Sequence, residues 1–346
     1  YNRMHVHTLI IGAGPGGLAC AKILAEQGMD TIVLERKKVI GPKVCAGGIT
    51  WSGLISRVPE TLAEKSFPKQ YIKTPFQNIC IQEKTAIIAT VNREKLGQHM
   101  AQLAHDAGAK IRTGVIVRKI HTGALLVIDK ENGTEEEISF DNLVGADGSS
   151  SLVRRFLKLE SKRLGIGINY QIPGDVPKME WHLNNRLFGN GYAWIFPHVD
   201  TISIGAYADR KTMAPGKLKD NLISWAGKQG YDLKQHPAHA EYINYDYQGW
   251  HFANIFLVGD AAGLASGLTG EGIYPAIISG EQIALTIANP DHSTAIMDGL
   301  ISRHDKHSRM VAISGKNGLL NSVLAELVTL GLRSGMIKFG KLEMAV

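Results

Sequence analysis

Cysteine is scarce in this chain of 346 residues, which has only Cys20, Cys45 and Cys80. Their irregular spacing offers neither a disulfide framework nor a Cys-x-x-Cys metal pair, so we expect reduced thiols, a cytoplasmic protein and no metal site. No stretch reaches the ~18 apolar residues that a membrane-spanning helix needs. We expect no secretory signal either, because the apolar start VHTLIIGAGPGG is short and interrupted by glycines.

Nucleic-acid-binding signatures are also lacking, since no RNP, zinc-finger or helix-turn-helix pattern occurs. The net charge of +6 favours anionic partners of another kind. Basic clusters at residues 36–38, 154–155 and 158–163 leave two interpretations open. They are solvated faces, or they contact a phosphate-bearing cofactor, a substrate or a membrane surface.

Glycine, in contrast, is abundant, with 38 residues. Residues 6–11 predict a buried parallel strand, followed by a glycine turn, a helix to about residue 27 and a second strand, TIVLE. In this dinucleotide fingerprint Gly12 makes the tight turn, Gly14 lets the backbone approach a pyrophosphate, and Gly17 lets helix and strand pack closely. The helix N-terminus offers N–H groups to phosphates. Glu35 ends the second strand at the ~20-residue spacing of a ribose-binding carboxylate.

The rest of the chain predicts a mixed α/β protein. Residues 76–91 alternate and predict an antiparallel hairpin, and residues 92–108 predict an amphipathic helix with Leu96, Met100 and Leu103 on one stripe. Three further strands are expected between residues 110 and 147. Between about 164 and 250, short alternating strands predict an antiparallel sheet, and IFLVGDAAG then returns to the nucleotide-binding pattern.

Two later motifs resemble the flavoproteins of the para-hydroxybenzoate hydroxylase superfamily, which bind one FAD in an extended pose. They are LVGADGSSSLVRR, with Asp147, and IFLVGDAAGLASGLTGEGIYPAIISG, with Asp260. The resemblance implies that Asp260 holds a ribityl hydroxyl, that Arg93 contacts FAD, and that the helix after Gly272 faces the flavin N1–C2=O edge. A helix N-terminus stabilises the negative charge of a reduced flavin.

Three stretches narrow the resemblance to the geranylgeranyl reductase family, over about residues 6 to 290. They are PKVCAGGIT, GYAWIFP and GDAAG…GEGIYPAIISG. These flavoenzymes saturate carbon–carbon double bonds of prenyl chains. The family resemblance implies that the loop around Cys45 lies across the FAD, which needs small residues such as Ala46 and Gly48. Cys45 is then a pocket-lining or proton-handling catalytic thiol, or else an apolar filler of the turn.

We therefore expect an α/β fold of the glutathione reductase type, with a Rossmann-like FAD-binding domain and an inserted antiparallel-sheet substrate domain. The FAD-binding domain comprises residues 1–75, 92–160 and 251–310, the substrate domain residues 76–91 and 161–250, and a helical tail residues 311–346. Predicted cofactor contacts are Gly12, Gly14, Pro15, Gly16, Gly17, Glu35, Arg36, Cys45, Ala46, Gly48, Arg93, Val117, Asp147, Asp260, Gly270, Gly272 and Ile273.

Substrate contacts are predicted for GYAWIFP, through Tyr192, Trp194, Phe196 and Pro197. In a strand the three aromatic side chains share one face. They form an apolar slot for a prenyl tail, or they are sheet core. The family usually continues with Gly-x-Gly, but here Tyr207 replaces the second glycine, and its ring would shorten or redirect the slot.

The tail predicts a helix over residues 318–333, with Leu320, Leu324, Leu327 and Val328 on one face. Flanked by Arg333, Lys338 and Lys341, this helix either lies on an anionic membrane or packs on its own domain. The C-terminus is short for the family, so we expect the substrate cover to be partly missing or built differently.

The residues leave three functions open, of which we place prenyl reduction first. In it, reduced flavin gives hydride to one alkene carbon, and an acid, or water admitted past Cys45, protonates the other. His198 and Glu271 are the candidate acids nearest in sequence. The alternatives are a monooxygenase acting on an aromatic small molecule or protein side chain, with flavin halogenases as a remoter version, and an electron-carrying flavoprotein. NAD(P)H or a protein is the expected electron donor, because no second fingerprint occurs.

Overall fold

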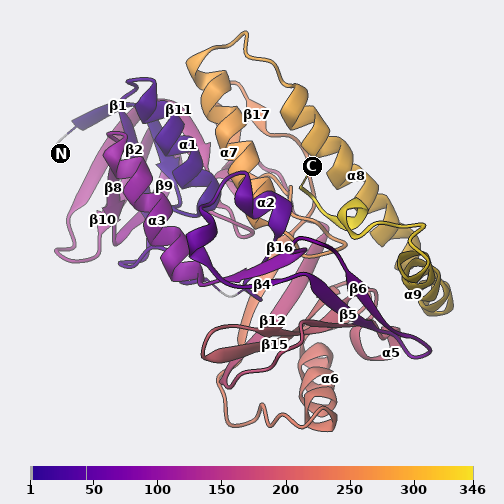
Figure 1. Cartoon of the computed structure of the whole chain (residues 1–346). Helices are drawn as coiled ribbons and strands as arrows, with labels where there is room; N and C mark the ends of the chain where they lie inside the picture. Colours follow the sequence, from indigo (N-terminus) through magenta and orange to yellow (C-terminus); the bar gives the residue numbers. More distant parts are fainter. Residues whose placement is uncertain (1–2, 44, 346) are drawn as a thin grey trace.

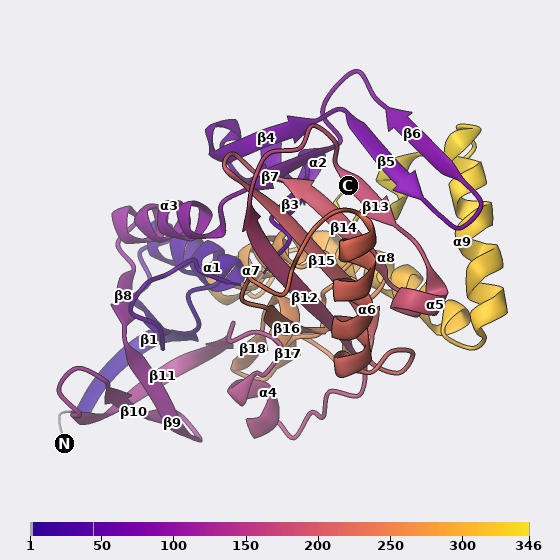
Figure 2. The ribbon, with the colours of Figure 1, turned by 90° about the horizontal axis from the view of Figure 1, so that it is seen from below.

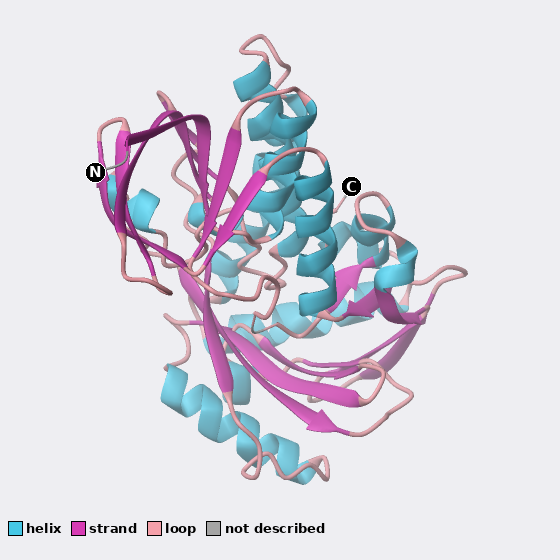
Figure 3. Ribbon diagram, turned by 90° about the vertical axis from the view of Figure 1, so that its left-hand side faces the viewer, coloured by secondary structure: helices cyan, strands magenta, loops and turns pink. Residues whose placement is uncertain are grey.

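The computed structural model describes residues 3–43 and 45–345, so Tyr1, Asn2, Val44 and Val346 lie outside the described residues. The described residues form three sheets, of eight, seven and three strands. The two larger sheets are separate layers, with helices packed beside the first and beneath the second (Figures 1 and 3).

The eight-stranded sheet is the nucleotide-binding layer, with β17-β18-β11-β1-β2-β8 in order and β10 and β9 attached to β11. Its parallel strands are β1 (Arg3–Ile11), β2 (Thr31–Glu35), β8 (Lys110–Thr113), β11 (Glu135–Gly145) and β18 (Ile255–Leu257). β10 (Ala124–Asp129) runs antiparallel to β11, β17 (His251–Phe252) antiparallel to β18, and β9 (Val115–His121) antiparallel to β10. Ile11 pairs with Gly145, and Gly145 with Leu257. The fingerprint and both later motifs therefore leave the sheet at one edge.

Helices α1 (Pro15–Glu26) and α7 (Ile273–Ala288) pack against each other unusually closely beside this sheet. A Cβ atom on Gly280 would lie 2.1 Å from the carbonyl oxygen of Gly16. The predicted helix at 92–108 is α3 (Arg93–Asp106), but Leu103 is 38% exposed and does not share the buried stripe of Leu96 and Met100. The other elements around this layer are α4 (Leu152–Phe156), η2 (Gly259–Ala261) and α8 (Ala295–Ser314).

The seven-stranded sheet has the order β16-β12-β15-β14-β13-β5-β6. Its strands between residues 164 and 244 pair antiparallel, as predicted, whereas β5 runs parallel to β13. Alternation gives the sheet two different faces: Ala193 and Ile195 pack with Leu222 and Trp225 of α6 (Pro215–Lys228), a helix that the sequence interpretation missed. Figure 2 shows α6 covering this outer face. The strands are β5 (Lys69–Lys73), β6 (Asn78–Gln82), β12 (Leu164–Pro173), β13 (Glu180–His182), β14 (Tyr192–Pro197), β15 (Thr201–Asp209) and β16 (His239–Asn244), with the short helix α5 (Asn185–Phe188).

The predicted hairpin over residues 76–91 is wrong. Strand β6 pairs with β5, through a turn in which the Thr74 hydroxyl accepts from the Gln77 backbone N–H at 2.9 Å. Strand β7 (Ile88–Val91) instead joins β3 (Gly48–Thr50) and β4 (Ala63–Phe67) in the small sheet, beside α2 (Trp51–Ile55) and η1 (Glu60–Leu62). The domain division remains a prediction, but the seven-stranded sheet draws on residues 69–82 as well as 164–244.

The tail forms α9 (Gly318–Arg333) and η3 (Phe339–Leu342). Helix α9 lies against the β5–β6 hairpin, where Gln77 Nε2 donates to the Glu326 backbone carbonyl at 2.9 Å. The chain then returns to the centre of the molecule, where Arg303 donates to the carbonyls of Glu343 and Ala345 at 3.1 Å. Within residues 3–43 and 45–345, no helix is both long and apolar enough to cross a membrane.

Candidate flavin and substrate site

A cavity of about 880 Å³ lies where the motif-bearing edge of the eight-stranded sheet meets the inner face of the seven-stranded sheet. Nearly all predicted cofactor and substrate residues line it together. Gly17 and Pro197 do not. A Cβ on Gly17 would lie 2.1 Å from the Gly12 carbonyl, so Gly17 serves helix packing, and the Pro197 carbonyl accepts from Thr90 Oγ1 at 2.9 Å.

Gly12 and Gly14, at the start of α1, are glycines for different reasons. Gly12 has φ +104°, and a Cβ there would lie 2.4 Å from the Ala146 carbonyl oxygen. A Cβ on Gly14 would meet no described protein atom closer than 4.0 Å. Packing within the chain therefore does not require glycine at position 14, whereas close approach of a ligand does. Gly14 caps α1 without a side-chain hydrogen bond, which leaves backbone N–H groups available to an anion.

Glu35 holds the turn beside this helix start. Its carboxylate accepts from the backbone N–H groups of Ala13 and Lys37, both at 2.9 Å. An ionised carboxylate has about four lone-pair sites, so capacity remains for hydroxyl groups of a ligand.

Four residues that line the cavity have a buried polar atom without a partner among the described residues: Arg93 Nε, Asp147 Oδ1, Asn190 Nδ2 and Glu326 Oε1. The other oxygen of Asp147 accepts from the backbone N–H of Leu152, and burial raises the pKa of Asp147 despite that bond. Buried polar atoms nearly always have a hydrogen-bond partner. These unpartnered atoms therefore indicate a polar ligand.

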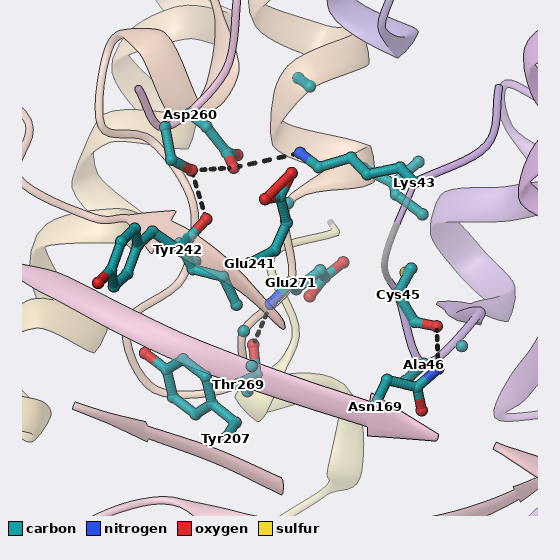
Figure 4. Close-up of a pocket in the computed structure, with 18 of the residues that line it drawn as sticks. Lys43, Cys45, Ala46, Asn169, Tyr207, Glu241, Tyr242, Asp260, Thr269 and Glu271 are labelled. Atoms are coloured by element: carbon teal, nitrogen blue, oxygen red, sulfur yellow. Dashed lines mark hydrogen bonds and ion pairs between the residues drawn. The ribbon is translucent and has the colours of Figure 1, made fainter. Parts of the chain in front are cut away.

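Asp260 lies across the cavity from the loop that carries Lys43, whose Nζ is 3.7 Å from the carboxylate (Figure 4). The Ser149 hydroxyl is 2.9 Å from the same carboxylate. Gly272 keeps this region open, because a Cβ there would lie 3.1 Å from Asp260 Oδ1. Gly272 also caps α7 without a side-chain bond, so a second helix N-terminus has free N–H groups at the cavity.

The loop around Cys45 is held from the seven-stranded sheet by groups that the sequence interpretation missed. Asn169 Nδ2 donates to the Cys45 carbonyl at 3.3 Å, and Ser203 Oγ in turn donates to Asn169 Oδ1 at 2.7 Å. A polar residue on an inward position of an otherwise apolar strand is the signal that could have identified Asn169.

His198, one of the two candidate acids, does not line the cavity. It is buried, and its Nε2 lies 3.0 Å from the Ala46 carbonyl, while Nδ1 contacts Glu64. His198 therefore positions the loop. Glu271, the other candidate, does line the cavity.

The aromatic side chains of β14 share the inward face of the sheet. Ring centroids are 6.0 Å apart for Tyr192 and Trp194, and 6.2 Å apart for Trp194 and Phe196. The ring of Trp181, a residue that no motif indicated, packs against Phe196 with the ring centroids 4.7 Å apart. These rings are both a buried cluster and a cavity wall, so the two interpretations of the motif are compatible.

Tyr207 occupies the place where the family pattern has a second glycine. Its hydroxyl donates to the Gly267 carbonyl at 2.8 Å, and its ring fills the space over Gly165, where a Cβ would lie 2.3 Å from the ring. The buried ring narrows this end of the cavity.

The residues present fit FAD. Two uncapped helix N-termini, an unobstructed glycine and four residues with an unpartnered polar atom line one cavity whose other wall is aromatic. No group of three or more side chains able to hold a metal occurs in the described part of the chain.

Comparisons with known proteins agree with this geometry. Residues 5–169 match the sequence family described as an FAD binding domain. Digeranylgeranylglycerophospholipid reductase 2 of Methanosphaera stadtmanae is 29% identical over 325 residues, covering 86% of this chain and 80% of that protein. The chloroplastic geranylgeranyl diphosphate reductase of Oryza sativa is 27% identical over 314 residues, covering 80% of this chain and 65% of the rice protein.

Solved structures share the fold. A geranylgeranyl bacteriochlorophyll reductase-like protein of Thermoplasma acidophilum superposes with a TM-score of 0.76 at 21% identity, covering 96% of this chain and 98% of that one. The myxobacterial chondrochloren halogenase superposes with a TM-score of 0.68 at 16% identity, covering 96% and 90%. The predicted fold and family resemblance are confirmed: the chain is an FAD-dependent oxidoreductase related in sequence to the geranylgeranyl reductases.

Proposed function

We propose that this protein reduces carbon–carbon double bonds of a prenyl or similarly apolar substrate. The observation that carries the proposal is the composition of one cavity, where the dinucleotide fingerprint faces an aromatic wall built from Trp181, Tyr192, Trp194 and Phe196. Such a wall excludes water and accepts an apolar chain. The names of the relatives support a prenyl substrate.

The helix starts and turns would hold FAD. The N-terminus of α1 at Gly14 would bind the pyrophosphate, Glu35 the ribose and Asp260 the ribityl chain, with Arg93 and Asp147 gaining their missing partners. The N-terminus of α7 would stabilise negative charge on the reduced ring. Bound FAD supplies hydride once NAD(P)H or an electron-carrier protein has reduced it.

The far end of the substrate slot is formed by α9. Leu324, Val328 and Leu332 face the cavity, whereas Leu327, predicted on the same stripe, is exposed. An apolar chain would lie along these leucines and valine toward the aromatic wall, with Tyr207 limiting its depth.

A single experiment tests the proposal. FAD bound to the protein is reduced anaerobically with dithionite, and a geranylgeranyl phospholipid in detergent is added while flavin absorbance is followed. Reoxidation by the lipid, with a saturated product found by mass spectrometry, is expected. Flavin that stays reduced with lipid but forms an oxygen adduct whose decay responds to an aromatic compound would establish the monooxygenase instead. Tyr207, which shortens the slot, is the observation that keeps this alternative in the experiment.

We further propose that α9 contacts an anionic lipid surface. Its outer face exposes Leu319, Val323, Leu327 and Leu330, and the neighbouring hairpin exposes Phe76. Arg333, Lys338 and Lys341 are exposed beside this apolar face and complement anionic headgroups.

Vesicle co-sedimentation tests this contact. Binding to phosphatidylglycerol vesicles is expected to exceed binding to phosphatidylcholine vesicles, and Leu327→Asp is expected to abolish it. The control is Ile296→Asp on α8, because Ile296 is 54% exposed and Leu327 56%. Equal binding by both variants would refute the assignment of this face.

A further inference from the structure

Glu271 lines the cavity immediately before α7 (Figure 4). Its Oε2 accepts from the backbone N–H of Met344 at 2.8 Å. Oε1 has only a long contact, 3.4 Å, with the Thr50 hydroxyl. Because Oε2 already accepts a strong bond, an acidic proton on this carboxyl would be carried by Oε1.

The surroundings favour that proton. Burial raises the pKa of Glu271 to about 7, and the neighbouring Glu343 carboxylate acts in the same direction, while the Met344 N–H, the Thr50 hydroxyl and Arg303 oppose it. A carboxyl group with a pKa near neutrality can both give up a proton and recover it from water. Glu271 lines the same cavity as Cys45 and Tyr192, and the segment just before it lies against the aromatic wall: the Tyr192 hydroxyl donates to the Thr269 carbonyl, and a Cβ on Gly270 would be 3.5 Å from that hydroxyl.

Other candidate donors are already engaged. The hydroxyls of Tyr192 and Tyr207 donate to the backbone carbonyls of Thr269 and Gly267, and burial raises the pKa of both phenols. Cys45 Sγ accepts from the Gly47 N–H at 3.3 Å, and a thiol is a weaker acid than a carboxyl group.

The other cavity carboxylates differ from Glu271. Glu35 and Asp147 accept from backbone N–H groups, and Asp260 faces Lys43. Glu326 accepts from Thr74 and Gln77, and Glu343 from Ser52. Glu241 lies on the edge strand β16, which β12 and β15 separate from the aromatic strand β14. Among the described residues that line the cavity, Glu271 combines a proton-bearing oxygen with a position beside the aromatic wall.

We propose that Glu271 is the acid that protonates the substrate alkene. This inference rests on the proposed function. The hydride from reduced FAD forms one C–H bond, and the π electrons of the double bond take the proton from Oε1 to form the second. The alkene becomes a single bond, FAD is left oxidised, and the Glu271 carboxylate takes a proton from water. Glu271 would then be a catalytic residue, and Met344 a positioning residue that fixes which oxygen carries the proton.

The test uses Glu271→Gln, which keeps the size of the side chain and removes its acidity. The control is Glu281→Gln, the same change on α7, where Glu281 pairs with Arg57 outside the cavity. Under anaerobic single-turnover conditions, Glu271→Gln is expected to slow lipid-driven flavin reoxidation about 100-fold or more, with little change in the lipid concentration at half-maximal rate. Glu281→Gln is expected to match the wild type.

Two further readouts separate acid catalysis from a structural effect. The wild-type rate is expected to fall as the pH rises through about 7, and the Glu271→Gln rate to lose this dependence. In flavin-free protein, infrared difference spectra are expected to show a protonated-carboxyl band that titrates near pH 7 and is absent from Glu271→Gln. If Glu271→Gln reduced the lipid as fast as the wild type, the role of Glu271 would be overturned and the proposed function would stand. A wild type that never reduces any prenyl lipid would overturn the proposed function itself.

Discussion

Substitution of Gly14 with alanine is expected to separate cofactor binding from folding. Gly14 has φ −76° and ψ 174°, which alanine adopts without strain, and the added Cβ would be 4.0 Å from the nearest described atom. Lower chain entropy in the unfolded state contributes about 0.4–1 kcal/mol. The poorer helix cap costs a similar amount, about 0.5–1 kcal/mol. The free energy of unfolding of the flavin-free protein should therefore change by less than about 1 kcal/mol.

The effect on FAD should be much larger. A methyl group forced into a close contact costs about 1–3 kcal/mol, which corresponds to about a 5- to 140-fold higher Kd at 1.4 kcal/mol per tenfold. Fluorescence titration of the flavin-free protein with FAD, together with urea unfolding, measures both quantities.

Gly17→Ala is the control with the opposite outcome. Its Cβ would lie 2.1 Å from the Gly12 carbonyl oxygen, so the unfolding free energy should fall by about 3 kcal/mol or more. An unchanged Kd for FAD in Gly14→Ala would refute the assignment of the α1 N-terminus to the pyrophosphate.

Three further predictions follow from buried groups. Arg154→Met should lower the unfolding free energy by about 3–5 kcal/mol in urea, because the buried guanidinium binds the carbonyls of Ala261, Ala262 and Asp246. The free energy of unfolding of the flavin-free protein should fall by up to about 3 kcal/mol as the pH rises from about 4.5 to 7, because folded Glu271 keeps a proton that it has lost in the unfolded chain. Glu271→Gln should remove this part of the pH dependence. Asn169→Leu should speed thiol labelling of Cys45 in a Cys80→Ser background, because the Cys45 carbonyl loses its donor.

The nucleotide-binding half could be predicted well from the sequence because its signals are local. Each motif joins the end of one strand to a turn, and parallel strands bring their carboxyl ends to a shared edge whatever lies between them. Gly12, Gly14, Asp147 and Asp260 meet at the cavity for this reason.

The parts that could not be predicted depend on pairings between distant segments. Alternation identified β6 and β7 as strands but not their partners, because the pattern of one strand does not name its neighbour. Trp181 and Asn169 belong to strands without a motif. The contact of Met344 with Glu271 spans 73 residues, and no periodicity encodes it. The sequence leaves two interpretations open for the basic pair at residues 154–155, and neither of them describes Arg154, which is buried and donates to the Asp246 carbonyl. Arg155 lines the cavity.

The glycine contact between α1 and α7 joins segments made at very different times during synthesis. A ribosome-bound chain has its fingerprint turn early, but the second helix start at the cavity does not exist until Ile273 has emerged. Capture of the cofactor is therefore expected only after most of the polypeptide has been released. Until α7 has been made, the face of α1 that packs against it must be covered by another part of the chain or by another protein.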